Sequence, residues 1–140
     1  MKILVDTNVA LDILLERGDF YPAAMSVFLL AEKNVITGYV SASAVTDIFY
    51  VAGKHIGKAG AREAVRHLLH VFHPATVTDG HIYRALDFEW DDFEDCVQHI
   101  VGESVSADYI VTRDVAGFAA GSVTAITPER FLETISVTGE

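Results

Sequence analysis

The stretch from Lys2 to Asn8 constrains the fold of this chain more than any other. Its residues 3–5 are an unbroken apolar run, typical of a strand buried on both faces, and the run ends abruptly at Asp6. A helical pattern of apolar residues follows at once. In an open α/β sheet, ligands bind at the carboxyl ends of the strands. We therefore expect Asp6 to belong to a functional site, because a carboxylate removed from water there needs a compensating partner such as a cation.

Strands and helices alternate along the rest of the chain. Apolar runs predict further strands over 35–40, 74–77, 109–112 and 123–126. Amphipathic periodicity predicts helices over 8–17, 21–33, from Ser43 to a break at Gly57 and Gly60, 61–72, 79–86, 92–105 and after Thr127. This order predicts an α/β protein, a three-layer α/β/α sandwich with a central, mainly parallel sheet. No repeat or linker divides the chain, so we expect a single domain over residues 1–140.

Composition and charge narrow the class of protein. A hydrophobic content of 51% with 21% charged residues is typical of a folded globular domain. One cysteine, Cys96, excludes an internal disulfide, and neither a signal peptide nor a membrane-spanning run is evident, so we expect a cytoplasmic protein with no membrane partner. The net charge of −10 argues against a surface that binds polyanions generally. Six of the acids fall within residues 87–95, however, and a bound divalent metal would offset part of that local charge.

Four acidic residues follow strands or begin helices, and they come from distant parts of the chain. Asp6 and Asp114 each follow a predicted buried strand, whereas Asp47 and Asp95 each lie in about the first turn of a predicted helix. Such a cluster is unfavourable by itself, because like charges raise one another's pKa. Mg²⁺ and Mn²⁺ prefer carboxylate oxygens, and beside a phosphodiester such a metal can activate water and stabilise charge on the phosphate. For Asp47 and Asp95 a simpler interpretation is also open, as a surface residue and a favourable charge at a helix N-terminus.

These motifs, taken together and in this order, resemble a PIN domain, the metal-dependent nuclease family that includes the VapC-type toxins of toxin–antitoxin pairs. The resemblance covers nearly the whole chain. The matching segments are Val5-Asp6-Thr7-Asn8, Ser41-Ala42-Ser43 through Asp47, Asp92-Phe93-Glu94-Asp95-Cys96-Val97-Gln98, Tyr109-Ile-Val-Thr-Arg-Asp114, and the closing Thr127-Pro128-Glu129-Arg130-Phe131.

The resemblance implies an Mg²⁺- or Mn²⁺-dependent endoribonuclease that cleaves single-stranded RNA, with the toxin of such a pair as one role open to it. It implies catalytic and metal-binding roles for Asp6, Asp47, Asp95 and Asp114, with Thr112 and Asn8 as supporting residues. The family usually has glutamate where this chain has Asp47, whose shorter side chain could reach a metal through water. The resemblance also implies a homodimer and an antitoxin partner. The alternatives are a catalytically weak or inert PIN-like module that binds RNA or protein, favoured by Asp47 and the acidic charge, and a nuclease directed at DNA.

Other features leave two interpretations open. Lys58, Arg62 and Arg66 form a basic stripe that is either a solvated helix face or a track for an RNA backbone. Arg113 could contact phosphate or pair with an acid. The aromatic residues around the acidic run belong to the core, to a dimer surface or to a platform for unpaired bases; they are Phe88, Trp90 and Phe93. The histidines lack matching cysteines, which argues against zinc. His99 follows Asp95 by four residues on the same predicted helix and could reach the cleft, but we expect it to be packed or solvated.

Overall fold

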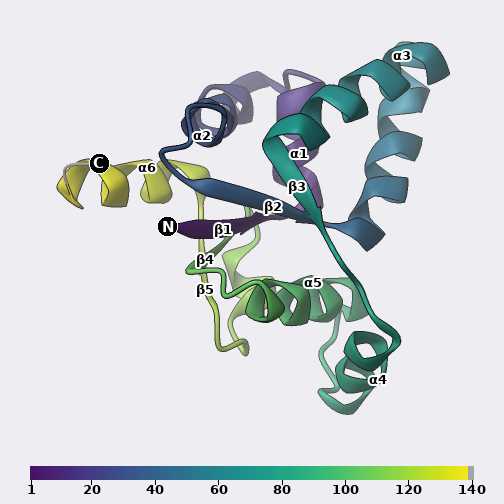
Figure 1. Cartoon of the computed structure of the whole chain (residues 1–140), viewed down its shortest axis with the longest axis vertical. Coiled ribbons are helices and arrows are strands. Elements are labelled where there is room, and N and C mark those ends of the chain that lie inside the picture. The colour runs from purple at the N-terminus through teal and green to yellow at the C-terminus, as the bar shows by residue number, and fades with distance from the viewer. Residues whose placement is uncertain (139–140) are drawn as a thin grey trace.

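A five-stranded sheet with every strand parallel organises the computed structural model, which describes residues 1–138 (Figure 1). The spatial order of the strands is β3-β2-β1-β4-β5. Their bounds are β1 (Lys2–Val5), β2 (Thr37–Ser41), β3 (Phe72–Ala75), β4 (Tyr109–Val111) and β5 (Thr124–Ile126). The expected parallel sheet is therefore confirmed, with β1 at its centre.

Helices cover both faces of the sheet, which confirms the expected three-layer α/β/α sandwich. In Figure 1, α1, α2 and α3 lie above the sheet and α4 and α5 lie below it, while α6 lies beside α2. The bounds are α1 (Thr7–Leu14), α2 (Tyr21–Glu32), α3 (Ala42–Val71), α4 (Asp79–Asp87), α5 (Phe93–Ser104) and α6 (Pro128–Thr138), with short 3₁₀ turns η1 (Gly18–Phe20) and η2 (Val115–Phe118). Within residues 1–138, we find no helix with the length and apolar character needed to cross a bilayer.

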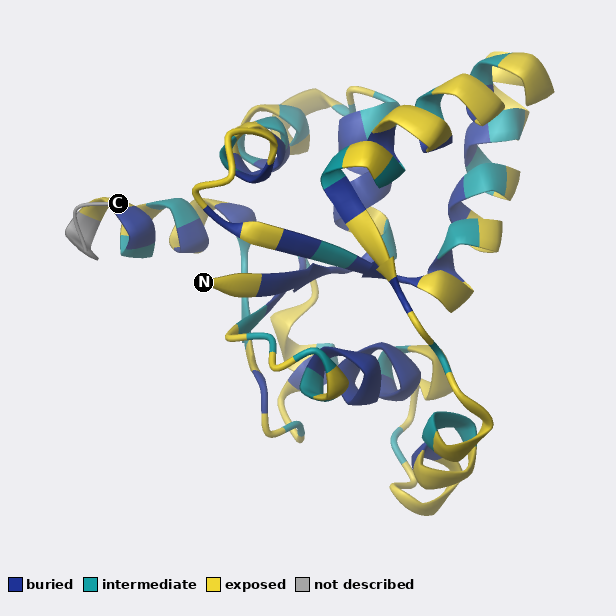
Figure 2. Ribbon diagram, in the orientation of Figure 1, coloured by how far each residue is buried: buried dark blue, intermediate teal, exposed yellow. Residues whose placement is uncertain are grey.

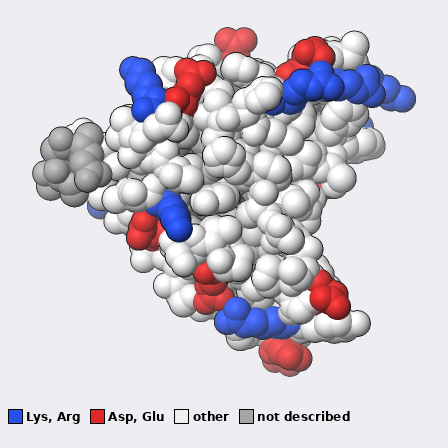
Figure 3. All heavy atoms as spheres, viewed as in Figure 1, with Lys and Arg blue, Asp and Glu red and all other residues white. Residues whose placement is uncertain are grey.

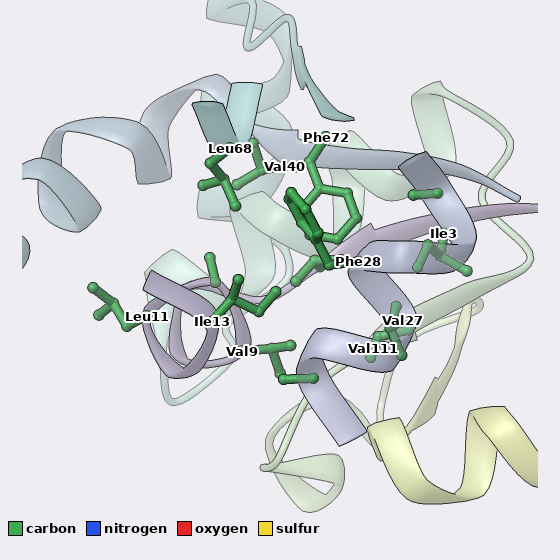
Figure 4. Packing of buried hydrophobic residues seen from close by; sticks show 14 of the residues in the cluster. Ile3, Val9, Leu11, Ile13, Val27, Phe28, Val40, Leu68, Phe72 and Val111 are labelled. Carbon is green, nitrogen blue, oxygen red and sulfur yellow. The ribbon is translucent and has the colours of Figure 1, made fainter. Parts of the chain in front are cut away.

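β1 contributes side chains to hydrophobic clusters on both faces of the sheet. Ile3 and Val5 pack with α1, α2, α3 and α6 on one face, and Leu4 packs with α4 and α5 on the other. All three are fully buried, as the apolar run predicted, because successive strand residues point to opposite faces. In Figure 2 the buried residues follow the sheet and the helix faces that cover it. Figure 4 shows the larger cluster, where Phe28 meets Phe72 edge-to-face with ring centroids 5.6 Å apart.

Some predicted boundaries were wrong by a few residues, and the structure shows why. The first helix ends at Leu14 rather than residue 17, since Glu16 has a left-handed backbone with φ 49°. β3 begins at Phe72 instead of 74, because Phe72 pairs with Gly38 of β2 and packs its ring where a Gly38 side chain would be. A Cβ on Gly38 would lie 2.4 Å from that ring.

α3 contains the break that the sequence predicted between two helices, although the second helix begins earlier than residue 61. The expected break at Gly57 is present as a kink, with φ 80° and ψ 161°, but helix resumes immediately on its far side. The two predicted helices thus form one bent arm that rises from β2 and returns to β3 (Figure 1). Glycine suits this point because the left-handed region of backbone space costs it little.

Candidate functional site

The ends of β1 and β4 bring Asp6 and Thr112 together. Val5 pairs with Val111 in the sheet, so the next residue on each strand emerges at the same edge. The Thr112 hydroxyl donates to Asp6 Oδ2 at 2.8 Å and accepts from the Asp114 backbone N–H at 2.9 Å. Thr112 therefore links the two strand-end aspartates.

Asp6 is buried, with 4% of its surface exposed, yet its side chain does not cap α1. Its second oxygen, Oδ1, accepts a hydrogen bond from Gln98 Nε2 at 3.0 Å. Both oxygens are thus fixed by neutral donors, so the carboxylate is oriented without a cationic side chain. We expected Asn8 to fix Asp6; instead Asn8 is exposed on the wall of the adjoining pocket, and in the described chain Gln98 and Thr112 hold Asp6.

A pocket of about 460 Å³ opens beside Asp6, and we call it the acidic pocket. It is lined by all four predicted aspartates, Asp6, Asp47, Asp95 and Asp114, together with Glu94 and Asp92. These residues come from the ends of β1 and β4 and from the starts of α3 and α5. No lysine or arginine is among its described lining residues. The convergence expected from the sequence is therefore present, and the charge gathered there is entirely negative.

Asp95 and Asp114 flank the same small space beside Gly117. A Cβ on Gly117 would lie 2.6 Å from Asp114 Oδ2 and 3.0 Å from Asp95 Oδ2. Asp114 also accepts the Gly117 backbone N–H at 3.2 Å, which caps η2. Gly117 thus leaves room for the two carboxylates to approach one another, because it has no side chain.

Gly117→Ala tests this arrangement. We expect the added methyl group to displace the two carboxylates and to lower metal-dependent activity by about 10- to 100-fold, since displacements of about 1 Å can cost that much. Stability should change little, because the crowded atoms are the ends of side chains. Activity and urea unfolding of Gly117→Ala should be compared with Gly53→Ala, whose Cβ has no described neighbour closer than 4.0 Å. Equal activity in the two variants would contradict the assignment.

Mutual repulsion and burial raise the proton affinity of this pocket. The pKa of Asp95 is raised to about 7, first by burial and then by the charges of Asp6, Asp92, Asp114 and Glu94. Burial, followed by the charges of Asp47, Asp92 and Asp6, also raises the pKa of Glu94, against the hydrogen bond from Thr7. These shifts identify a cluster whose negative charge a bound cation would balance.

The donor set fits a hard divalent cation in its chemistry. Every acidic ligand candidate offers carboxylate oxygens, the type that Mg²⁺ and Mn²⁺ prefer. As the side chains stand, no three acids, histidines or cysteines among residues 1–138 are grouped closely enough to form a ready coordination sphere. Water ligands and small side-chain rotations would have to complete one, as is usual for Mg²⁺, which retains several waters. Asp47, exposed at the pocket wall, is the acid most suited to act through water.

Three residues at or near the site were not selected from the sequence. Gln98 has a detectable signal, since it follows Asp95 by three positions and so shares its helix face. Glu94 was noted only as part of the segment from Asp92 to Gln98, although it also lines the acidic pocket. Asp12 gave no signal: it is 1% exposed and binds Arg113 Nε at 2.8 Å, which resolves the open question about Arg113 in favour of an ion pair.

The remaining candidates lie outside the acidic pocket. Lys58, Arg62 and Arg66 are exposed on the outer part of α3, where basic residues form the blue area at the upper right of Figure 3. Arg66 pairs with Glu63, as on a solvated helix face. His99 is packed, with its Nε2 accepting the Val123 N–H at 3.1 Å, and Cys96 is a buried core residue. Figure 3 also shows a hollow on the right, between α3 and the α4–α5 layer.

The fold and the site define an α/β protein with a carboxylate-lined pocket at the carboxyl edge of a parallel sheet. A family model described as "PIN domain" matches residues 2–116, and the chain belongs to the PIN-domain family, whose members are generally nucleases. A solved structure, VapBC2 from Rickettsia felis bound to a DNA fragment from its promoter, is similar with a TM-score of 0.70 and 15% identity, over 91% of this chain and 98% of that chain. That likeness supports the fold. No curated protein sequence matches the chain.

Proposed function

We propose that this PIN domain is an endoribonuclease that cleaves single-stranded RNA and requires Mg²⁺ or Mn²⁺. The observation that carries the proposal is the meeting of four aspartates from four elements in one pocket that has no basic residue among its described lining. A structural role would not require so many like charges, because like charges held close together repel one another. Family membership supplies the reaction class, which is phosphodiester hydrolysis.

In the proposed mechanism, Asp6, Asp95 and Asp114 hold the metal, and Asp47 either holds it or orients the attacking water. A bound divalent ion supplies activation of water and stabilisation of charge on the phosphate. Gln98 and Thr112 are positioning residues, since they fix the two oxygens of Asp6 rather than contact the substrate. The Thr112 hydroxyl also fixes the backbone at Asp114, so one side chain aligns two ligands.

The toxin role is part of the proposal. The similar structure is a complex named VapBC2, which supports an antitoxin as partner of this chain, and a homodimer is proposed with it. An antitoxin that covered the acidic pocket would block access of RNA. Co-expression with the product of a neighbouring small reading frame, followed by co-purification and loss of nuclease activity, would support this role. Activity unchanged by every such partner would contradict it.

The nuclease proposal is tested by incubating the purified protein with a fluorescently labelled single-stranded RNA, in Mg²⁺, in Mn²⁺ and in EDTA. A DNA of the same sequence and a fully paired RNA serve as matched substrates. We expect cleavage of the single-stranded RNA only when metal is present. Metal binding without turnover of any strand would favour the alternative, an inert binding module, which the absence of a ready coordination sphere in the described residues also supports. Preferential cleavage of the DNA would instead assign a deoxyribonuclease.

Metal affinity should depend on pH, because the proton on Asp95 competes with the metal. With a pKa of about 7 for Asp95, the apparent Mn²⁺ affinity should rise by about tenfold per pH unit below pH 7 and level off above it. Isothermal titration calorimetry at several pH values, in buffers of different ionisation enthalpy, would measure both the affinity and the proton released. A flat profile between pH 5 and 7 would contradict the charge balance described here.

The stability of the metal-free protein should change with pH in the opposite direction to metal affinity, and this provides a control. A carboxyl whose folded-state pKa lies above its ordinary value of 3.8 binds more protons when folded, so its contribution to stability falls as the pH rises from about 4 to 7. In EDTA, wild type should therefore lose stability over this range relative to Asp95→Asn, as measured by urea unfolding. Added Mn²⁺ should restore the stability of wild type at pH 8 but not that of Asp95→Asn.

A further inference from the structure

A second pocket, of about 700 Å³, adjoins the acidic pocket, and we call it the aromatic pocket. The two pockets share Asp92, Asp95 and Asp114 as lining residues. A group that occupied the aromatic pocket would thus lie next to the proposed metal-binding carboxylates. The mechanism proposed above does not use this space, so its lining needs a separate explanation.

The rest of the lining is flat, apolar or acidic. Phe88, Glu89, Trp90 and Asp91 form one part, and η2 and the turn after it contribute only small residues, Ala116, Gly117, Ala119 and Ala120. No lysine or arginine is among the described lining residues, so nothing there would balance a phosphate. The ligand chemistry that suits such walls is uncharged and planar.

The ring of Trp90 packs against two other rings, those of His99 and Phe118. Its ring lies 5.1 Å from that of His99 at an angle of 35° and meets Phe118 edge-to-face at 6.2 Å. His99 is itself fixed by the Val123 N–H, and Phe118 is buried. Trp90 nevertheless retains partial exposure at the pocket wall, and Phe88 beside it is 43% exposed. An aromatic surface that is ordered before binding loses little conformational entropy when a ligand stacks on it.

We propose that the aromatic pocket binds one unpaired nucleobase of the substrate, next to the phosphate that enters the acidic pocket, with Trp90 and Phe88 as stacking surfaces. The inference rests on the proposed function, since it assumes that a nucleic-acid strand enters the acidic pocket. A base held in a duplex presents its faces to its neighbours in the stack and is not free to enter. The aromatic pocket thus selects single strands, and it provides attraction that the acidic pocket lacks.

The test uses the fluorescence of Trp90, which is the only tryptophan in the sequence. Short single-stranded oligonucleotides with phosphorothioate linkages, which slow cleavage, are titrated in Mn²⁺ into the wild-type protein, and binding is followed in parallel by anisotropy. We expect quenching of Trp90 on binding, with RNA and DNA arms showing whether the sugar matters. A series of oligonucleotides is then compared, each with one abasic site at a different position. Only the oligonucleotide whose missing base would occupy the aromatic pocket should fail to quench Trp90, and it should bind about tenfold more weakly. A duplex should not quench.

Two variants separate stacking from folding. Phe88→Leu, at an exposed position, should weaken binding of the intact oligonucleotide several-fold and leave binding of the register-matched abasic strand unchanged. Trp90→Phe keeps an aromatic ring and should largely keep the affinity, whereas Trp90→Leu should lose it. Binding without quenching, a flat abasic scan, or no binding of any strand would overturn the proposal. The outcome is separable from the proposed function: cleavage without quenching rejects only the base site, and quenching by wild type without cleavage rejects only the nuclease.

Discussion

Asp6→Asn should abolish metal-dependent cleavage, with a loss of more than about 100-fold, because it removes the buried carboxylate that the strand end and two hydrogen bonds hold at the acidic pocket. Calorimetry should show loss of Mn²⁺ binding in the same variant. The effect is expected to be large because the neutral amide cannot replace the negative charge, although its shape is nearly the same.

The fold of Asp6→Asn should survive. The new amide would present an NH₂ group to one of two donors, but Gln98 can rotate its own amide to offer Oε1, which has no partner in the described structure. The cost to the free energy of unfolding should then stay below about 2 kcal/mol. Asp87→Asn, at an exposed position outside both the acidic and the aromatic pocket, is a matched control that should cleave normally. Normal cleavage by Asp6→Asn itself would show that the site is wrongly assigned.

Arg113→Ala should destabilise the fold by about 3 kcal/mol, because it strips Asp12 of its main partner. Asp12 is 1% exposed and accepts Arg113 Nε at 2.8 Å, whereas the other cation near it, Arg17, lies 3.7 Å away. The Arg113 guanidinium also lies over the ring of Phe20, 4.0 Å from its centroid. The contacts tie the loop after β4 to α1 and η1. The change should be measured by urea unfolding at neutral pH.

Two further variants distinguish the buried pair from general packing. Arg17→Ala should cost much less than Arg113→Ala, since its distance to Asp12 is longer and Asp12 retains Arg113. In the double variant Asp12→Leu with Arg113→Leu, apolar side chains replace both members of the ion pair, and much of the lost stability should return. Equal costs for the two single arginine variants would mean that the ion pair with Arg113 is not the source of the effect.

Part of the site was predictable because its positions are local properties of the sequence. An apolar run that ends in Asp6 predicts a strand-end carboxylate, and parallel strands present their ends at one edge. The starts of α3 and α5, signalled by Ser41 to Ser43 and by Asp92, place Asp47 and Asp95 near that edge. Helix caps and strand burial depend on residues that are close together in the sequence, and the order of the elements is given by the chain itself. One sequence is therefore enough to predict them.

The sequence by itself thus determined the parallel α/β architecture, the burial of β1 and the identity of the converging aspartates. The tertiary structure decided the rest. Gln98 and Thr112 fix Asp6 from 92 and 106 positions away, and Asp12 meets Arg113 across 101 positions. The packing of Phe72 on Gly38 sets where β3 begins. Such contacts depend on distance and orientation between elements, and local periodicity contains no information about either.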